Sequence, residues 1–92
     1  MAAQPMAVVA VRDSAMQAYA NPIFVPAVGI AIRSFADEVN RNEANNQLNQ
    51  HPEDFELWHV ATWQPETGSF ETPESGPRCL CRGKDVLTNK ER

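Results

Sequence analysis

One stretch of the chain, residues 55–63, constrains the fold most strongly. Apolar and polar residues alternate along it, and alternation with a period of two is typical of a β-strand with one buried face. The next five residues, Gln64–Gly68, place proline where a type I turn accepts it and glycine where a hairpin loop needs a left-handed conformation. Ser69-Phe70-Glu71 then returns as the partner strand. We therefore expect a β-hairpin formed by residues 55–63 and 69–72.

Strict alternation assigns each side chain of this strand to one of two faces. Leu57 and Trp63 fall on one face together with His59, whereas Trp58 and Val60 fall on the other. At most one tryptophan can then pack under a covering helix. We expect the second tryptophan to be exposed, covered by a loop or covered by a partner, and a face that carries Trp58 and Val60 would suit a dimer interface.

A helix is expected over residues 27–41, directly after Pro26, whose missing N–H costs nothing at a helix start. Its apolar residues recur at helical spacing. They are Val28, Ala31, Ile32, Phe35, Ala36 and Val39. A competing interpretation makes residues 28–32 a strand and lets Ser34 and Asp37 cap a shorter helix.

The remaining segments are shorter. We expect a first strand at residues 6–12, helix-like spacing over 13–21, and an extended segment at 23–25. Residues 42–51 are rich in amides and predict a surface loop anchored by Leu48, because such side chains compete for backbone hydrogen bonds. This order of elements predicts an α+β fold in which one main helix covers one face of a small antiparallel sheet.

The length of 92 residues allows one domain. We expect it to occupy residues 1–77, with residues 78–92 adding a short edge strand and a basic, polar C-terminal tail. Leucine, isoleucine, valine and phenylalanine together number only 19, so the core is small. A small core makes self-association plausible, and we expect a homo-oligomer formed through Trp58 and Val60 or through the first strand.

The net charge of −4 is unevenly distributed. Residues 1–77 carry 3 basic and 10 acidic side chains, whereas residues 78–92 carry 5 basic and 2 acidic ones. The basic end could contact phosphate groups or fold back on the acidic body. If the protein binds single-stranded DNA, the candidate residues are Arg78, Arg82, Lys84, Lys90 and Arg92, with Trp58 as a stacking ring.

Catalytic and metal sites are not indicated. Cys79 and Cys81 would be neighbours on one side of a strand, and a disulfide closing so short a loop would be strained. His51 and His59 lack the paired spacing of metal ligands, and neither lies near a nucleophile in a recognisable context. We therefore expect a protein without cofactor or metal that is not an enzyme.

Targeting signals are not indicated either. The apolar run near the N-terminus ends at Arg12 after about six residues and has no basic residue before it, so it is not typical of a secretory signal. No stretch approaches the roughly 20 apolar residues of a membrane span. We expect a cytosolic protein without membrane contact.

Several sequence blocks resemble a small non-structural protein of gokushovirus-like microviruses, which are phages with single-stranded DNA genomes. The blocks cover roughly residues 6–72, and the second and third are fairly specific. They are Tyr19-x-x-Pro22-x-Phe24, Ala31-Ile32-Arg33-Ser34-Phe35-Ala36-Asp37-Glu38-Val39-Asn40, His51-Pro52-Glu53-Asp54-Phe55-Glu56-Leu57-Trp58 and Thr67-Gly68. The usual acidic turn before Thr67 is here Gln64-Pro65-Glu66.

The resemblance implies a non-enzymatic accessory protein in the host bacterial cytoplasm. It would act in replication of the viral genome or in the switch to packaging, by binding DNA or a viral or host replication protein. No catalytic residues are implied. The alternatives are a scaffold-like or minor virion protein, and an acidic inhibitor directed at the host.

Overall fold

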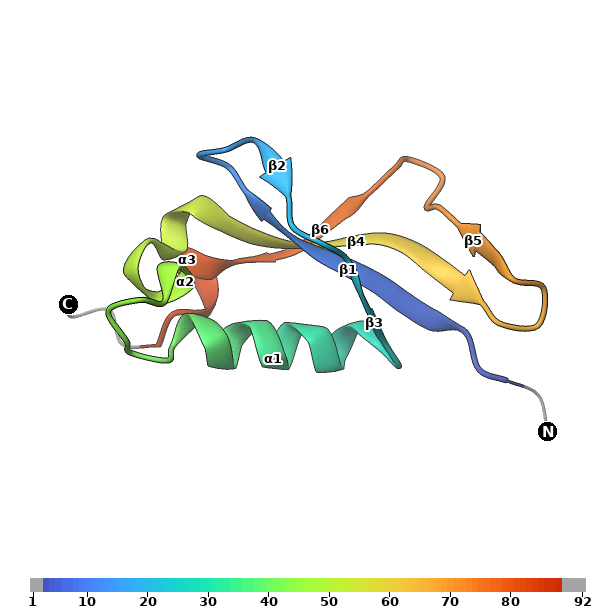
Figure 1. Cartoon of the computed structure of the whole chain (residues 1–92), viewed down its shortest axis with the longest axis horizontal. Helices are drawn as coiled ribbons and strands as arrows, with labels where there is room; N and C mark the ends of the chain where they lie inside the picture. The colour runs from blue at the N-terminus through green and yellow to red at the C-terminus, as the bar shows by residue number, and fades with distance from the viewer. Residues whose placement is uncertain (1–2, 89–92) are drawn as a thin grey trace.

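The computed structural model describes residues 3–88 and has the α+β fold expected from the sequence (Figure 1). The main helix, α1, spans Val28–Val39. The strands are β1 (Met6–Asp13), β2 (Ala18–Tyr19), β3 (Ile23–Val25), β4 (Phe55–Gln64), β5 (Ser69–Glu71) and β6 (Arg78–Arg82). Three short helices complete the described part of the chain: α2 (Gln47–Gln50), the 3-10 helix η1 (Pro52–Asp54) and α3 (Gly83–Val86).

The two long strands, β1 and β4, form the centre of an antiparallel sheet. On one side, β2 and β3 both pair with β1; on the other side, β5 and β6 both pair with β4. The predicted hairpin is thus confirmed as β4 and β5. Because β1 lies inside the sheet, it offers no free edge for pairing with a second copy.

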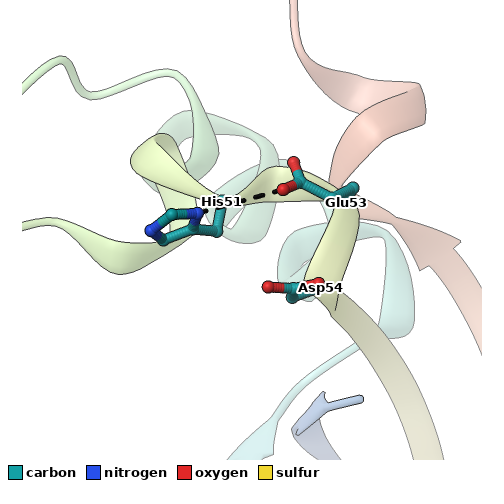
Figure 2. Close-up of side chains that lie close together, drawn as sticks. All are labelled: His51, Glu53 and Asp54. Atoms are coloured by element: carbon teal, nitrogen blue, oxygen red, sulfur yellow. Dashed lines mark ion pairs between the residues drawn. The ribbon is translucent and has the colours of Figure 1, made fainter. Parts of the chain in front are cut away.

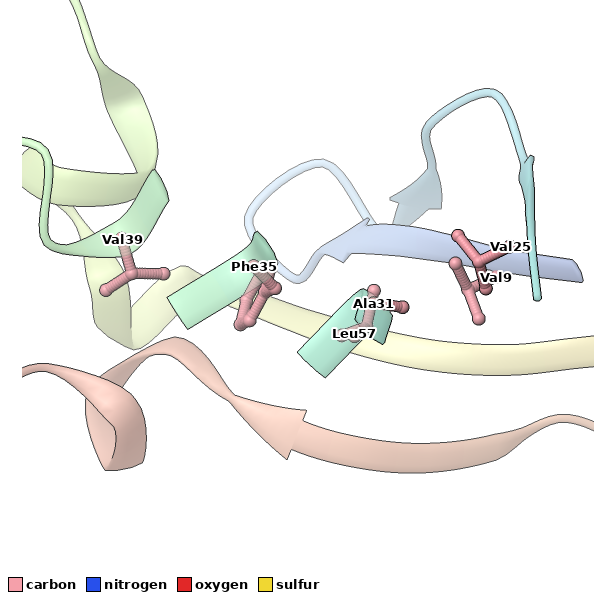
Figure 3. Packing of buried hydrophobic residues seen from close by; sticks show 6 residues of the cluster. All are labelled: Val9, Val25, Ala31, Phe35, Val39 and Leu57. Atoms are coloured by element: carbon pink, nitrogen blue, oxygen red, sulfur yellow. The ribbon is translucent and has the colours of Figure 1, made fainter. Parts of the chain in front are cut away.

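The core lies between α1 and one face of the sheet, which we call the helix face (Figure 3). Ala31, Phe35 and Val39 project from α1 at the predicted spacing and are buried. They pack with Val9 of β1 and Leu57 of β4. The helical interpretation of residues 27–41 is therefore confirmed, and the competing strand at residues 28–32 is wrong.

The stretch after β1 is a turn, although its spacing looked helical. The Asp13 carboxylate accepts hydrogen bonds from the backbone N–H groups of Ala15 (2.9 Å) and Met16 (3.4 Å). Gln17 adopts a positive φ of 55° and reverses the chain. An aspartate that binds the backbone two and three residues ahead favours a turn over a helix.

The amide-rich segment after α1 is more than a surface loop. Asn46 and Asn49 are buried, and their Nδ2 groups donate to carbonyls at the end of α1. Asn46 reaches the carbonyls of Glu38 and Arg41, and Asn49 reaches that of Val39. The last carbonyls of a helix need partners, and here side-chain amides supply them. Leu48 contacts the core, as predicted.

The chain beyond Arg82 was expected to be a polar tail, but residues 83–88 fold against the domain. Val86 and Leu87 pack on the core. The Asn40 side chain donates to the carbonyl of Val86 and accepts from the backbone N–H of Thr88 at 2.8 Å. A Cβ at position 83 would collide with the carbonyl group of Pro52, so the close approach of α3 to η1 requires glycine.

We expect Phe35→Ala to lower the free energy of unfolding by about 3–5 kcal/mol, because it empties the centre of a small core. Urea denaturation followed by far-UV circular dichroism measures the loss. Ile30→Ala, on the exposed side of the same helix, should change stability by less than about 1 kcal/mol. Equal losses for the two variants would contradict this core.

Substitution of two glycines by alanine is expected to change the stability of the protein in opposite directions. Gly83→Ala should destabilise the protein by about 1–3 kcal/mol, because the new Cβ meets the Pro52 backbone. Gly29→Ala should stabilise it by roughly 0.5–1 kcal/mol, since Gly29 lies within α1 with open space around it. Thermal unfolding of both variants checks the signs, and a stabilising Gly83→Ala would show that α3 does not approach η1 closely.

Candidate nucleic-acid interface

A β-bulge in β4 decides which side chains share a face of the sheet. Val8 pairs with Ala61 and Val9 pairs with His59, so Val60 is an extra residue without a partner on β1. A single extra residue shifts the alternation of side chains by one beyond that point. Even-numbered residues of β4 before Val60 therefore lie on the same face as odd-numbered residues after it.

As a result, Trp58 and Trp63 lie on the same face, and the expectation of opposite faces is wrong. Trp58 pairs with Ala10 and Trp63 pairs with Met6, and these two residues of β1 share one face. That face is opposite α1, and we call it the open face. In the described part of the chain, no helix covers it (Figure 1). Val60 itself has no partner on β1, so the register does not assign it to the face of Trp58.

Three rings form a cluster toward one end of the open face. Trp63 lies 4.9 Å from Phe70 and 6.1 Å from Phe24, measured between ring centroids. Phe24 and Phe70 are 47% and 58% exposed, so the cluster is not a closed core. The bulge places Trp63 beside both phenylalanines, which come from β3 and β5.

Two further rings lie toward the other end of the open face. Tyr19 meets Trp58 edge to face, with centroids 5.9 Å apart, and Tyr19 is 44% exposed. The guanidinium of Arg12 lies 5.8 Å from the centre of the Tyr19 ring, within the range of a cation–π contact.

A row of charged side chains crosses the sheet beside Trp58. Glu56 pairs in register with Arg12 on one side and with Arg82 on the other. Its carboxylate accepts a 3.0 Å hydrogen bond from the Trp58 indole and lies 3.5 Å from the Arg82 guanidinium. One carboxylate thus lies between two cations, and the row carries a net positive charge.

Small side chains form the floor beneath the rings. Val8, Ala10 and Ala61 belong to the open face by register, and all three are buried. A floor of small residues lets large rings lie close to the backbone, so that their edges and faces remain partly exposed.

The predicted basic residues do not form one group. Arg82 belongs to the open face, whereas Arg78 pairs with His59 on the helix face. Arg78 there lines a cleft of about 230 Å³ with His59, and the Nε2 atom of His59 is buried without a hydrogen-bond partner among the described residues. Lys84 is exposed on α3, and Lys90 and Arg92 lie outside the described residues.

The two cysteines are also separated by a bulge. Cys79 pairs with Trp58 and Cys81 pairs with Leu57, so Leu80 is the extra residue and the cysteines belong to opposite faces. Their expected position on one side of the strand is therefore wrong. Both are free, and burial raises the pKa of each thiol; the charge of Glu56 adds to this effect at Cys79.

These raised pKa values predict slow alkylation near neutral pH. A thiol with a raised pKa is almost entirely protonated at pH 7, and only the thiolate reacts. The rate of iodoacetamide labelling should therefore increase roughly tenfold per pH unit between pH 7 and 9. Mass spectrometry of both cysteines measures it, and fast labelling that does not change over this range would contradict the expectation.

One cluster of metal-ligand types lies at η1 (Figure 2). Ligand atoms of His51, Glu53 and Asp54 lie within 4.8 Å of one another, and His51 Nδ1 is 3.9 Å from a Glu53 oxygen. The side chains of His51 and Glu53 are more than half exposed. No further feature of the described residues indicates a ligand there, so we assign no metal site to the cluster.

The aromatic open face lies within the region that a family model matches. The model is described as phage ORF5 protein and matches residues 6–86. The chain belongs to this phage family. No curated protein and no solved structure matches the chain significantly. None of the helices within residues 3–88 is long and apolar enough to cross a membrane.

Proposed function

We propose that this member of the phage ORF5 family is a non-enzymatic accessory protein that binds single-stranded DNA on its open face during genome replication. The observation that carries the proposal is the arrangement of five aromatic rings beside two arginines on a sheet face that no helix within residues 3–88 covers. Exposed rings next to positive charge are the usual basis of binding to single strands.

The rings provide two places where bases can stack. One is Trp58 with Tyr19, and the other is Trp63 with Phe24 and Phe70. Because one of the residues between Trp58 and Trp63 belongs to the bulge, the two sites are about 13 Å apart along the strand. At roughly 3.4 Å per nucleotide along a stacked strand, the two sites are about four nucleotide steps apart, so a DNA strand that contacts both spans about five nucleotides.

Two arginines on this face can contact phosphate groups. Arg12 comes from β1 and Arg82 from β6, on either side of Glu56. Arg82 is the residue that belongs both to the open face and to the basic residues predicted from the sequence as DNA contacts. Neutralising two phosphates implies a salt dependence of about −1.4 in log K against log salt, at roughly −0.7 per contact with a single strand.

The same features favour a single strand over a duplex. Stacking on protein rings requires bases whose faces are free, and a duplex hides those faces. The body of the protein carries seven more acidic than basic side chains within residues 1–77, which opposes wide contact with the dense charge of a duplex.

Family membership and the sequence blocks supply the biological setting. A phage protein that resembles the non-structural proteins of microviruses would meet single-stranded DNA in the cytoplasm of the host bacterium. Binding there would serve replication of the viral genome or the switch to packaging, alone or with a viral or host replication protein.

A titration with oligo(dT) tests the proposal. Intrinsic tryptophan fluorescence should be quenched saturably, since both indoles lie on the proposed site. Phe70→Ser removes an exposed ring and keeps both tryptophans, so affinity should fall by about 1–3 kcal/mol, or roughly 5- to 150-fold. Met16→Ser, an exposed apolar position outside both ring clusters, should leave affinity within about twofold.

The outcome that contradicts the proposal is equally concrete. If oligo(dT) causes no quenching while sedimentation shows a dimer that Phe70→Ser dissociates, the open face is a contact between copies and not a DNA site. The homo-oligomer expected from the small core would then be the better explanation of this face.

The two arginines of β6 provide a matched comparison. Arg82→Gln should weaken oligo(dT) binding and reduce the salt slope by about 0.7, because it removes one phosphate contact. Arg78→Gln makes the same change in charge on the helix face and should alter neither quantity. Equal effects of the two variants would indicate diffuse attraction to the basic end of the chain.

A further inference from the structure

A second surface lies on the opposite side of the sheet, beside α1. Two hollows of about 210 and 220 Å³ meet at Val11, which lines both. The first lies between α1 and β3, and the second lies beneath the turn between β1 and β2. We call them together the edge groove. Its lining includes the core residues Val9 and Leu57, the exposed Met16 and Ile23, and the carboxylates of Asp13 and Glu38.

The edge groove is apolar and accessible. Ile23 at its border is 56% exposed and Met16 is 75% exposed. Between them the groove reaches the core residues Val9 and Leu57. A small domain gains stability when such a surface is covered, and nothing among residues 3–88 covers it.

The charged groups of the groove have one sign. Among residues 3–88, the charged residues that line it are Glu38 and Asp13, and no lysine or arginine of this part of the chain does so. Arg41 contacts Glu38 but also Glu43 at 2.6 Å, so this group of three keeps a net negative charge. The Asp13 carboxylate accepts hydrogen bonds from the backbone N–H groups of Ala15 and Met16, and no lysine or arginine within residues 3–88 forms an ion pair with it.

Further carboxylates lie beside the turn at one end of the groove. Ser14 donates its backbone N–H to the carbonyl of Asp54 at 2.8 Å, which brings η1 with Glu53 and Asp54 next to this turn. An occupant of the groove is therefore expected to combine apolar side chains with positive charge. Nucleic acid fits this surface poorly, because its phosphates would face carboxylates.

The strand at the edge limits how a partner can bind. β3 has three residues and is flanked by Pro22 and Pro26, which cannot donate hydrogen bonds to an added strand. Binding must then come from side chains inserted into the groove. An amphipathic helix inserts its apolar side chains in this way.

We infer that the edge groove docks an amphipathic helix of a partner protein that carries apolar side chains on one face and lysine or arginine beside them. Tyr19 is shared by the groove and the open face, but Ile23 and Ser34 line the groove and belong to neither ring cluster, so the two proposals can be tested separately. Together the two surfaces would let the protein hold a basic partner protein on one side and a DNA strand on the other.

The test uses a fluorescently labelled amphipathic helical peptide built of leucine and lysine, with its leucine–glutamate analogue as the charge control. Fluorescence anisotropy at physiological ionic strength should show saturable binding of the lysine peptide and none of the glutamate peptide. Ser34→Trp, which fills the groove from the surface of α1, should abolish binding.

Two isoleucines provide the matched control. Ile23 lines the groove and Ile30 does not, yet Ile30 is similarly exposed at 49%. Ile23→Gln should weaken the lysine peptide by about tenfold or more, because it removes an apolar contact without changing charge. Ile30→Gln should leave affinity within about twofold, and both variants should keep the unfolding temperature and the oligo(dT) affinity of the parent.

Three results would overturn the inference. They are absence of saturable binding of the lysine peptide, equal weakening by the two glutamine variants, and equal binding of the two peptides. Absence of oligo(dT) binding by the parent protein would contradict the proposed DNA function and not the groove. The two failures are distinguishable, because neither isoleucine lies in the aromatic clusters of the open face.

Discussion

The extra residue at Val60 determines how this small sheet divides its side chains. Before the bulge, Leu57 points to the helix and Trp58 to the open face; after it, Ala61 and Trp63 share the open face with Trp58. Without that shift, Trp58 and Trp63 would lie on opposite faces of the sheet. With it, the helix face holds a core of modest side chains, and the large rings gather on the other side.

This division gives the two faces different chemistry. The helix face is sealed by α1 in its centre and leaves an apolar groove with acidic groups at the edge formed by β2 and β3. The open face carries partly exposed rings with Arg12 and Arg82. The two surfaces therefore differ in local charge: Asp13 and Glu38 line the groove, whereas Arg12 and Arg82 lie on either side of Glu56 on the open face.

Local sequence patterns predicted the elements well. Alternation gave the strand at 55–63, the Pro65 and Gly68 turn gave the hairpin, and the spacing of Ala31, Phe35 and Val39 gave the helix and its buried side. Each of these depends on neighbours a few residues apart. The turn after Asp13 was missed because helical spacing alone does not weigh a side-chain hydrogen bond that ends the pattern.

The candidate site could not be predicted in the same way, because it depends on register between distant strands. Nothing in the residues around Val60 or Leu80 signals which of them lacks a partner; that follows only from pairing with β1 or β4. The role of Gly83 likewise depends on Pro52, which is remote in sequence. Trp58 and Arg82 were identified as candidates from residue type alone, whereas Arg12, Tyr19, Phe24, Trp63 and Phe70 were missed.

The most direct test of this account is a ¹⁵N–¹H NMR titration of the labelled protein with oligo(dT). The two indole N–H signals report Trp58 and Trp63 separately. Both should shift and saturate at the same DNA concentration, together with the backbone amides of Phe24 and Phe70, while those of α1 remain unchanged. Two unmoved indole signals, or shifts confined to residues beyond Gly83, would contradict a DNA site on the open face.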